Sequence, residues 1–297
     1  MTTPATPRAR ETALRLYTPT GEEPGPFLKW AGGKTQLLPQ LEKFFPTRIP
    51  RYHEPFLGGG AVFFFLRGRG WLTGPVTLSD SNAELVNAYT VVRDDVDALV
   101  CHLARHRAAH SKDHFYSVRA LPFTPDAAGA ARMIYLNKTG FNGLYRVNSK
   151  GQFNVPLGSY TNPSVYDEAA LRRASRALQG VRLVVQDALD SLAEAGAGDL
   201  LYLDPPYVPL SATASFTGYV PGGFGPADQE RLADAVRAAD GRGARFVLSN
   251  SDTPAVRRLY LGFRIESVPA RRMINCDAAR RGEVNELIVA GIEAPMI

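Results

Sequence analysis

The apolar residues of the chain fall into short runs, and amphipathic stretches separate several of them. Runs over residues 51–56 and 76–79 predict two strands, with a glycine-rich turn and a helix over 61–67 between them. Later runs predict further strands over 181–185, 200–203, 245–249, 263–268 and 286–290. A helical pattern over 226–239 lies between two of these runs. Strands that alternate with helices in this way predict an open α/β sheet.

The stretch between the two sheet-forming portions has a different pattern. Helical periodicity continues to about Asn137, and residues 144–155 have the pattern of a β-hairpin that turns at 148–151. The sequence therefore predicts a second, mainly helical domain inserted into the α/β domain. The expected parts are a flexible tail over 1–26, the first α/β portion over 27–83, the inserted domain over 84–170 and the second α/β portion over 171–297.

Composition narrows the class of protein. The chain has 297 residues, 45% of them apolar, which is enough to bury a full core. No apolar run approaches the ~20 residues of a membrane helix, and residues 1–26 lack the apolar core of a secretory signal. Cys101 and Cys276 stand far apart in no C-x-x-C arrangement, so neither a disulfide framework nor a zinc site is indicated. This usage fits a reducing cytoplasm.

The positive charge is segregated along the chain. The net charge is only +5, but residues 101–180 contain eleven Lys and Arg against four Asp and Glu, which leaves −2 on the remainder. A basic segment on a nearly neutral body is typical of a protein that binds a polyanion, and nucleic acid is the commonest such partner. A basic face that contacts only solvent is the alternative interpretation of the same charges.

The candidate catalytic residues are Asp204-Pro205-Pro206-Tyr207. They follow the apolar run 200–203 directly, so they lie at the C-terminal end of a strand, where open α/β sheets bind ligands. The exocyclic N6 of adenine is a poor nucleophile, because its lone pair is delocalised into the ring. The Asp204 carboxylate and the Pro205 carbonyl can accept the two N6 hydrogens and localise that pair, while the Tyr207 ring can stack on an extruded base. A plain loop is the alternative interpretation of so short a motif.

A glycine-rich turn and a carboxylate suggest a pocket for a nucleotide-like ligand. Residues 53–60 run from a predicted strand through three glycines into a predicted helix, as nucleotide-binding loops do where the backbone approaches a ligand. Asp80 ends the strand over 76–79, where a carboxylate can accept hydrogen bonds from a ribose or an amino-acid group. Its alternative role is to cap the following helix over Glu84, and the two roles are compatible.

Two other motifs do not fit the chemistry that they first suggest. Residues 27–35 end in Gly-Lys-Thr like a P-loop, but Leu28 stands where the Walker pattern needs a glycine, which argues against an ATPase. Histidines that could pair on a helix around a metal recur every four residues, at His102, His106, His110 and His114. A four-residue repeat drifts around the helix, and residues 111–113 have the pattern of a break with a new N-cap. We therefore expect no metal, and a basic, partly protonated helix surface.

Together these motifs resemble those of the Dam-type (D12 class) DNA adenine-N6 methyltransferases. The resemblance runs from Phe27 to about Ile288 with the motifs in the family's order. It includes 27–34, 54–56, the strand end at Asp80, 142–144, 153–156, 204–207, 210–217, 248–250 and 285–287. The implied fold is a Rossmann-like S-adenosylmethionine-dependent methyltransferase sheet with an inserted, mainly helical DNA-recognition domain that carries a β-hairpin.

The resemblance also implies residue roles. The catalytic motif is Asp204, Pro205, Pro206 and Tyr207, and the residues implied to bind S-adenosylmethionine, the methyl donor, are Trp30, Lys34, Glu54, Phe56, Asp80 and Asp204. The residues implied to bind DNA are Lys29, Phe141, Asn142 and Arg146. Phe141 replaces the family's Tyr as the ring that wedges into the base stack, and Arg146 corresponds to a guanine-reading arginine. From the residues alone, the alternative for Phe141 is a buried core ring, and those for Arg146 are a phosphate contact or an exposed charge on a strand. Tyr145 stands where the family has a small residue.

The sequence thus predicts a site-specific adenine-N6 methyltransferase that acts on duplex DNA within GATC by direct in-line attack. Cytosine-N4 or RNA methylation uses related motifs, but Asp204, in place of the serine common in cytosine-N4 enzymes, argues against the former. A DNA-binding protein with an inactive catalytic fold is a third hypothesis, which the intact Lys34 and Asp80 oppose. We expect a monomer in the cytoplasm. Whether it acts alone or together with a restriction endonuclease of the same system is left open by the sequence.

Overall fold

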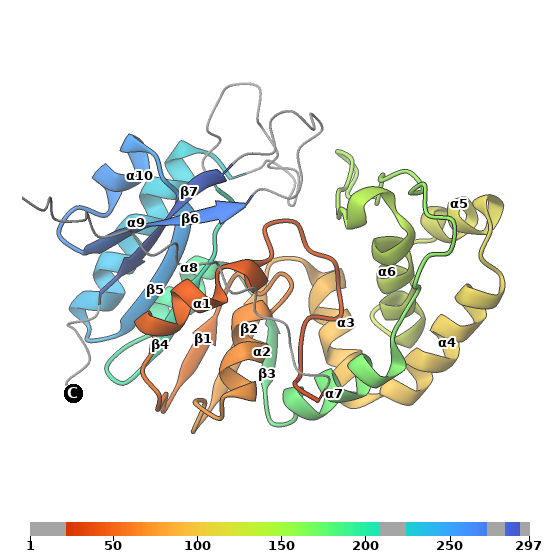
Figure 1. Ribbon diagram of the computed structural model, residues 1–297, viewed down its shortest axis with the longest axis horizontal. Coiled ribbons are helices and arrows are strands. Elements are labelled where there is room, and N and C mark those ends of the chain that lie inside the picture. Colours follow the sequence, from red (N-terminus) through yellow and green to blue (C-terminus); the bar gives the residue numbers. More distant parts are fainter. Residues whose placement is uncertain (1–21, 208–223, 272–282, 292–297) are drawn as a thin grey trace, which may run out of the picture.

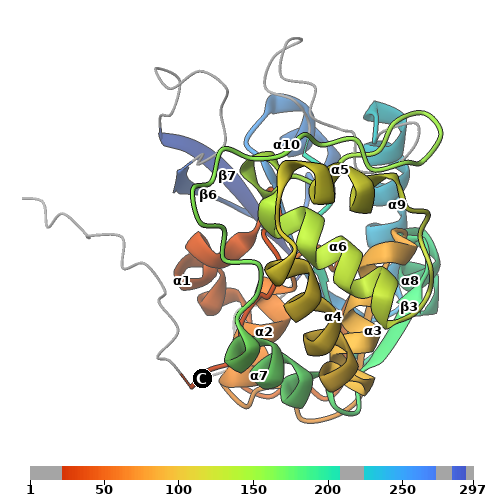
Figure 2. The same cartoon turned by 90° about the vertical axis from the view of Figure 1, so that its right-hand side faces the viewer.

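The computed structural model describes residues 22–207, 224–271 and 283–291 (Figure 1). A sheet with helices on both faces occupies one side of the molecule, and a group of helices lies beside it (Figures 1 and 2). The strands are β1 (Tyr52–Glu54), β2 (Val76–Asp80), β3 (Arg182–Val185), β4 (Leu200–Leu203), β5 (Arg245–Ser251), β6 (Arg264–Arg271) and β7 (Glu283–Ala290). The helices are α1 (Leu38–Leu41), α2 (Ala61–Gly68), α3 (Ala83–Asp94), α4 (Val96–Ala108), α5 (Lys112–Ala120), α6 (Ala127–Thr139), α7 (Glu168–Leu178), α8 (Ala188–Glu194), α9 (Pro226–Gly241) and α10 (Pro254–Leu259). Short 3-10 turns are η1 (Lys34–Gln36), η2 (Glu42–Phe44) and η3 (Phe141–Gly143).

The seven strands form one sheet in the order β3-β2-β1-β4-β5-β7-β6. The first five of these are parallel neighbours, whereas β7 runs antiparallel to both β5 and β6. Strands β1 and β4 are parallel neighbours, so their carboxyl ends lie at the same edge of the sheet. The strand order reverses between them, because β2 and β3 lie on one side of β1, whereas β4 and β5 lie on the other. Ligands of open α/β sheets bind outside the carboxyl ends at such a reversal. The predicted open sheet is confirmed, and the antiparallel β7 is a feature that the sequence pattern did not predict.

Strand β4 is buried on both faces. Tyr202 belongs to a hydrophobic cluster with the phenylalanines of α2, whereas Leu201 belongs to a second cluster with Leu232 of α9. A strand covered on both sides has a continuous apolar run rather than an alternating one, which is the pattern of Leu-Leu-Tyr-Leu. Because β4 is packed on both faces, it fixes the position of the backbone at Asp204, the residue that follows it.

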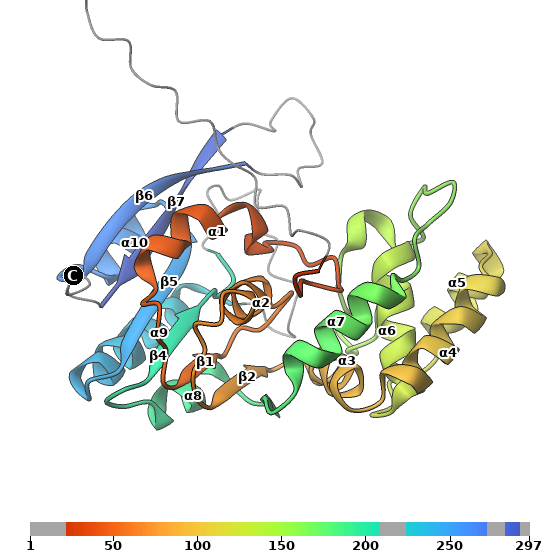
Figure 3. The same ribbon diagram turned by 60° about the horizontal axis from the view of Figure 1, so that its bottom comes forward.

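Between β2 and β3 the chain forms five helices, α3 to α7. Each begins at a residue whose side chain accepts a hydrogen bond from a first-turn backbone amide: Asn82, Asp95, Ser111, Asp126 and Asp167. Helix α6 is buried along most of its length and contacts α3, α4 and α5, and α7 contacts α2 and α3 (Figure 3). Buried side chains of α3 and α6 share one hydrophobic cluster with β1 and β2. The division into domains at residues 83 and 170 stays a prediction.

The predicted hairpin is present as a short antiparallel pairing. Val147 and Phe153 form an isolated bridge, flanked by hydrogen bonds from the Asn154 amide to the Arg146 carbonyl and from the Asn148 amide to the Gln152 carbonyl. The turn is closed by the Asn148 side chain, whose Oδ1 accepts from the backbone amides of residues 150 and 152. The pairing is therefore shorter than the predicted span of 144–155.

The histidine repeat surrounds a tyrosine of α6. His106 and His114 lie 3.0 Å apart between Nδ1 and Nε2, and His110 Nδ1 lies 2.8 Å from the Tyr135 hydroxyl. Burial, followed by the charges of His114 and His102, lowers the pKa of His106 to about 4, so this histidine is neutral at pH 7. The expectation of a partly protonated surface is wrong for His106, because burial of its ring against Tyr135 favours the neutral form. The predicted new N-cap at Ser111 is confirmed.

Several expectations fall on residues outside the described ranges. These are the tail over 1–21, the motif residues 210–217 and Cys276. Cys101 is exposed, and at the described end of the tail Pro24 lies against Gly68 of α2. Among the described residues, no helix is both long and apolar enough to cross a membrane.

Candidate active site

Polar side chains gather at the carboxyl edge of the sheet. Glu54 ends β1, Asp80 ends β2, Asp204 follows β4 and Ser249 lies near the end of β5. These four strands are parallel neighbours, so their carboxyl ends meet at one edge. Two of the four side chains are fully enclosed, with Glu54 at 2% and Ser249 at 0% exposure. A buried carboxylate needs compensating hydrogen bonds or charges, and the partners of these groups define the site.

Asp204 is paired with a lysine. Its Oδ1 lies 2.8 Å from Lys34 Nζ and accepts a hydrogen bond of 2.9 Å from Ser249 Oγ. Ser249 Oγ in turn lies 3.0 Å from the Tyr202 hydroxyl. Burial raises the pKa of Asp204, while the Lys34 charge opposes that rise by favouring the ionised form. The structure therefore brings together Lys34 and Asp204, which stand 170 positions apart in the sequence.

The turn after Asp204 is anchored by two buried amides. Gln229 Nε2 of α9 donates to the Pro206 carbonyl at 2.8 Å, and Asn250 Nδ2 donates to Gln229 Oε1 at 3.1 Å. Both side chains are buried, at 2% and 0% exposure. The Pro206 carbonyl is thus occupied by a fixed donor. Sequence reasoning missed Gln229, although a glutamine at a buried position of a helix that follows the motif is a signal that could have identified it.

Tyr207 is held at its hydroxyl and faces a cation. The hydroxyl donates to Glu286 Oε2 of β7 at 2.6 Å, and Lys34 Nζ lies 4.6 Å from the centroid of the Tyr207 ring. Burial raises the pKa of Tyr207 well above its usual range, and the charges of Asp204 and Glu286 raise it further. The phenol therefore keeps its proton and acts as a hydrogen-bond donor.

The glycine-rich turn is shaped around Trp30. Gly58 and Gly60 have φ of +47° and +65°, a region that residues with a side chain rarely adopt. A Cβ at Gly58 would lie only 2.9 Å from Trp30 Cδ1, so glycine is also required by close packing. The Gly58 amide donates to Asp80 Oδ2 at 3.2 Å. Trp30, the glycine turn and Asp80 thus lie against one another.

Asp80 stabilises the loop rather than the following helix. Its Oδ1 accepts from the Asn82 amide at 3.0 Å, and it is Asn82 whose side chain caps α3 by accepting from Leu85. The alternative role of Asp80 as the cap of α3 is therefore wrong. Burial raises the pKa of Asp80 to about 6, because two backbone donors compensate it only in part.

Glu54 and Phe56 lie on the other side of the glycine turn. Tyr52 donates its hydroxyl hydrogen to Glu54 Oε2 at 2.7 Å, and burial raises the pKa of Glu54 to about 8. This carboxyl group is therefore largely protonated at neutral pH. The half-buried Phe56 ring packs edge-on against Phe224, with 6.1 Å between centroids.

Lys29 and Trp30 are tied to the helical part of the molecule. Asn137 of α6 accepts from the Lys29 amide at 2.8 Å and donates to the Lys29 carbonyl at 2.6 Å. The Lys29 ammonium lies 4.4 Å from the centroid of the Tyr160 ring, and the Trp30 ring stacks on Tyr145 at 5.7 Å. Tyr145 is buried in this stack, which gives the position a packing role. Asn137 was not identified from the sequence, because its partner is 108 residues away.

The remaining predicted DNA-binding residues are exposed beside α6. Phe141 is 43% exposed in η3, so the alternative of a buried core ring is wrong. Asn142 follows it with φ of +54°, which turns the chain sharply. Arg146 is exposed on the hairpin, where its Nε donates to Asn154 Oδ1 at 2.7 Å. This hydrogen bond holds one edge of the guanidinium.

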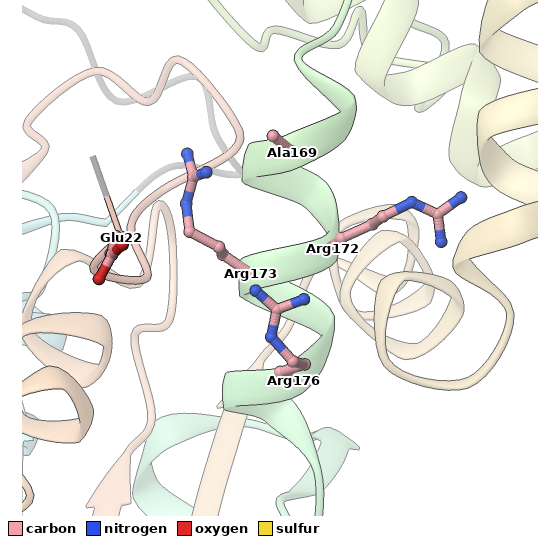
Figure 4. Close-up of a pocket in the computed structure, with 5 residues that line it drawn as sticks. All are labelled: Glu22, Ala169, Arg172, Arg173 and Arg176. Atoms are coloured by element: carbon pink, nitrogen blue, oxygen red, sulfur yellow. The ribbon is translucent and has the colours of Figure 1, made fainter.

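Other places where a ligand could bind are a cavity away from the carboxyl edge of the sheet and any cluster of metal-binding side chains. A cavity of about 530 Å³ lies along α7 and is lined by Glu22, Ala169, Arg172, Arg173 and Arg176 (Figure 4). The Arg172 side chain leaves the helix on the side opposite Glu22 and pairs with Asp97 and Glu168. Among the described residues, no cluster of three His, Cys, Asp or Glu is arranged to hold a metal ion.

Comparisons with known proteins identify similar chains. Residues 30–274 match the family of D12 class N6 adenine-specific DNA methyltransferases. A type II methyltransferase of Methanocaldococcus jannaschii is 42% identical over 286 residues, covering 89% of this chain and 98% of the relative. Another, from Lactococcus lactis subsp. cremoris, is 38% identical over 272 residues, with 89% and 94% coverage. A DNA adenine methylase of Escherichia coli is 34% identical over 271 residues, with 88% and 93% coverage.

Proposed function

The chain belongs to the D12 class of N6 adenine-specific DNA methyltransferases, and from this premise we propose that it methylates adenine within GATC in duplex DNA, with S-adenosylmethionine as the donor. The family makes it a site-specific, adenine-specific DNA methyltransferase. The observation that carries the proposal is the Asp204 carboxylate, held by Lys34 and Ser249 at the start of the D-P-P-Y turn.

Asp204 and Pro205 activate the adenine amine in this proposal. The Asp204 carboxylate and the Pro205 carbonyl accept the two N6 hydrogens, which localises the nitrogen lone pair toward the methyl donor. The neighbouring Pro206 carbonyl already accepts from Gln229, so its bond fixes the turn rather than the substrate. Lys34 opposes the rise in the pKa of Asp204 that burial causes, and so favours the ionised carboxylate, the form that accepts a hydrogen bond from N6.

The proposed cofactor pocket consists of Trp30, Lys34, Glu54, Phe56, Asp80 and Asp204. S-adenosylmethionine supplies an electrophilic methyl group on a sulfonium sulfur. Three features fit a ligand of this kind: a turn with two positive-φ glycines, the Asp80 carboxylate beside it, and the aromatic ring of Trp30 packed against the turn. In this proposal Asp80 accepts from ribose hydroxyls or an ammonium group, and the glycines allow close approach of the ligand.

The proposed DNA contacts come from the helical part of the chain. Phe141 supplies an exposed ring next to the sharp bend at Asn142, a shape suited to entering the base stack. Arg146 supplies an exposed guanidinium on a hairpin, where its Nε and Nη2 donate to Asn154, and a two-stranded ribbon fits the major groove. Lys29 supplies a cation near the site. Residues 84–170 are accordingly proposed as the target-recognition domain.

The biological setting is proposed from the relatives and the substrate. Two relatives carry the name type II methyltransferase, which supports a role beside a cognate restriction endonuclease. Others are named DNA adenine methylase, a name that mentions no endonuclease, and a solitary role is the alternative setting. A monomer in the cytoplasm, where the chromosome is available, fits both settings. Deletion of this gene alone distinguishes them, since loss of a methyltransferase that protects against its own endonuclease is lethal.

The proposal is tested by methyl transfer from tritiated S-adenosylmethionine to short duplexes. Each duplex carries GATC or one of its single-base variants, and the modified nucleoside is identified after digestion. The expected product is N6-methyladenine, formed fastest on GATC. N4-methylcytosine as the product would establish the alternative reaction, and equal rates on all duplexes would refute the assigned site. Absence of cofactor binding would support the inactive DNA-binding scaffold instead.

A further inference from the structure

Glu286 is an acidic residue of the sheet whose side chain contacts the D-P-P-Y turn at Tyr207. It lies on the antiparallel β7, and its Oε2 accepts the Tyr207 hydroxyl hydrogen at 2.6 Å. Residues 285–287 resemble a motif of the family, but that resemblance implies no function for Glu286. A hydrogen bond of this length from a phenol to a carboxylate is in the range of strong, charge-assisted bonds.

The Tyr207 ring is placed to interact with positive charge. Lys34 Nζ lies 4.6 Å from the ring centroid, within the distance of a cation–π contact. The carboxylate at the hydroxyl draws the phenol hydrogen toward itself, which leaves more electron density on the oxygen and the ring. The pKa of Tyr207 is raised by burial and by nearby carboxylates, so the proton stays on the phenol and the hydrogen bond persists.

We infer that Glu286 is a positioning residue that fixes the plane of the Tyr207 ring and makes the ring more electron-rich, so that it stabilises the positive charge that adenine acquires during methyl transfer. The inference rests on the proposed function, in which the extruded adenine stacks on Tyr207. Glu286 does not touch the base in this account, and its whole effect passes through the Tyr207 hydroxyl.

The charge changes of the reaction explain why an electron-rich ring helps. As the bond between N6 and the methyl carbon forms, the bond between that carbon and sulfur breaks, and positive charge moves from sulfur to the adenine amine. N6 then gives up a proton, for which the ionised Asp204 carboxylate is the nearest acceptor in the proposed arrangement. The π face of Tyr207 interacts most strongly with the base in the interval when the base is cationic. Such an interaction raises the rate rather than the ground-state affinity.

A purely mechanical role for Glu286 makes a different prediction. If the carboxylate only holds the ring in place, a neutral acceptor at the same position is sufficient. Glu286→Gln keeps an acceptor oxygen for the Tyr207 hydroxyl but removes the charge. Glu266→Gln on the neighbouring β6 is the matched control, because Glu266 pairs with Lys43 and Arg264 outside the catalytic turn.

The first test measures single-turnover methyl transfer at saturating cofactor and duplex. Glu286→Gln is expected to lower the rate by about 2- to 30-fold, the range of one cation–π contact, with little change in KM. In a Tyr207→Phe background, which lacks the hydroxyl, the same substitution is expected to have no effect. Equal losses in both backgrounds, or a wild-type rate in Glu286→Gln, would overturn the inference. If the wild-type protein methylates no adenine, the proposed function fails instead.

The second test is a binding measurement that needs no turnover, and it decides the question if Tyr207→Phe is inactive. Duplexes carry either a permanently cationic methylated adenine or a neutral mispaired adenine at the target position. Wild type is expected to favour the cationic base, and Glu286→Gln to lose about 2- to 30-fold of that preference. Glu266→Gln should retain it. An unchanged ratio of the two Kd values in Glu286→Gln would show that the charge of Glu286 does not affect how the Tyr207 ring interacts with the base, and would overturn the inference.

Discussion

Gln229→Leu tests whether the anchored carbonyl of Pro206 is required for catalysis. The substitution keeps most of the volume but leaves two buried groups without a partner, the Pro206 carbonyl and Asn250 Nδ2. Each unsatisfied group costs about 1–3 kcal/mol, so the free energy of unfolding should fall by about 2–6 kcal/mol. A native protein has a stability of roughly 5–15 kcal/mol, so a protein in the middle of that range remains folded at 25 °C after this loss.

The effect on the rate is expected to exceed the effect on folding. Without its donor the D-P-P-Y turn can shift, and a displacement of about 1 Å at a reacting group lowers a rate by roughly 100-fold. Chemical denaturation gives the stability, and single-turnover methyl transfer at 25 °C gives the rate. The control is Gln179→Leu, which removes similar bonds from an exposed glutamine to the carbonyls of Arg93 and Ser175. A folded Gln229→Leu protein that transfers methyl groups at the wild-type rate would refute this reasoning.

Three further predictions concern the helical part. Phe141→Ala should impair base extrusion, measured with 2-aminopurine at the target, more than cofactor affinity; normal extrusion would exclude the wedge role. Arg146→Ala should lose the preference at one guanine, by about 5- to 150-fold for a bidentate contact, when rates are compared across single-base variants of GATC. A uniform loss, with a salt slope lower by about 1, would instead identify a phosphate contact. For His106, whose pKa is lowered to about 4 from 6.5, the unfolded chain binds the proton more readily. Its contribution is therefore complete above pH 6.5 and is lost as the pH falls toward 4, so the stability difference from His106→Gln should shrink over that interval in pH-dependent denaturation; a constant difference would contradict the assignment.

The local features of the candidate site at the carboxyl edge of the sheet could be predicted from the sequence. A buried parallel strand has a continuous apolar run, and its carboxyl end is where ligands bind, so β4 and Asp204 were both identified in advance. The glycine turn was also predictable, because only glycine tolerates the backbone of Gly58 and Gly60. In such places the residue type and its immediate neighbours determine the structure.

Contacts between distant segments could not be predicted in this way. Three hydrogen-bonded pairs join separate elements of the fold: Asn137 with Lys29, Gln229 with Pro206, and Glu286 with Tyr207. No periodicity encodes such pairs, since they depend on how the elements pack. The same limit explains the error for His106, whose ring is buried against Tyr135 of α6 and is therefore neutral. The error for the cap of α3 is local instead: Asp80 accepts from the amides of Gly58 and Asn82, and the Asn82 side chain caps the helix.

The central claim is that the Asp204 carboxylate activates the adenine amine, and the most direct test is the single-turnover rate of Asp204→Asn and Asp204→Ala on a GATC duplex. Asp190→Asn, an exposed carboxylate on α8, is the matched control. Circular dichroism and chemical denaturation establish that each variant is folded. The account predicts a loss of at least about 100-fold in both Asp204 variants and none in the control. Wild-type turnover in a folded Asp204→Ala protein would contradict it.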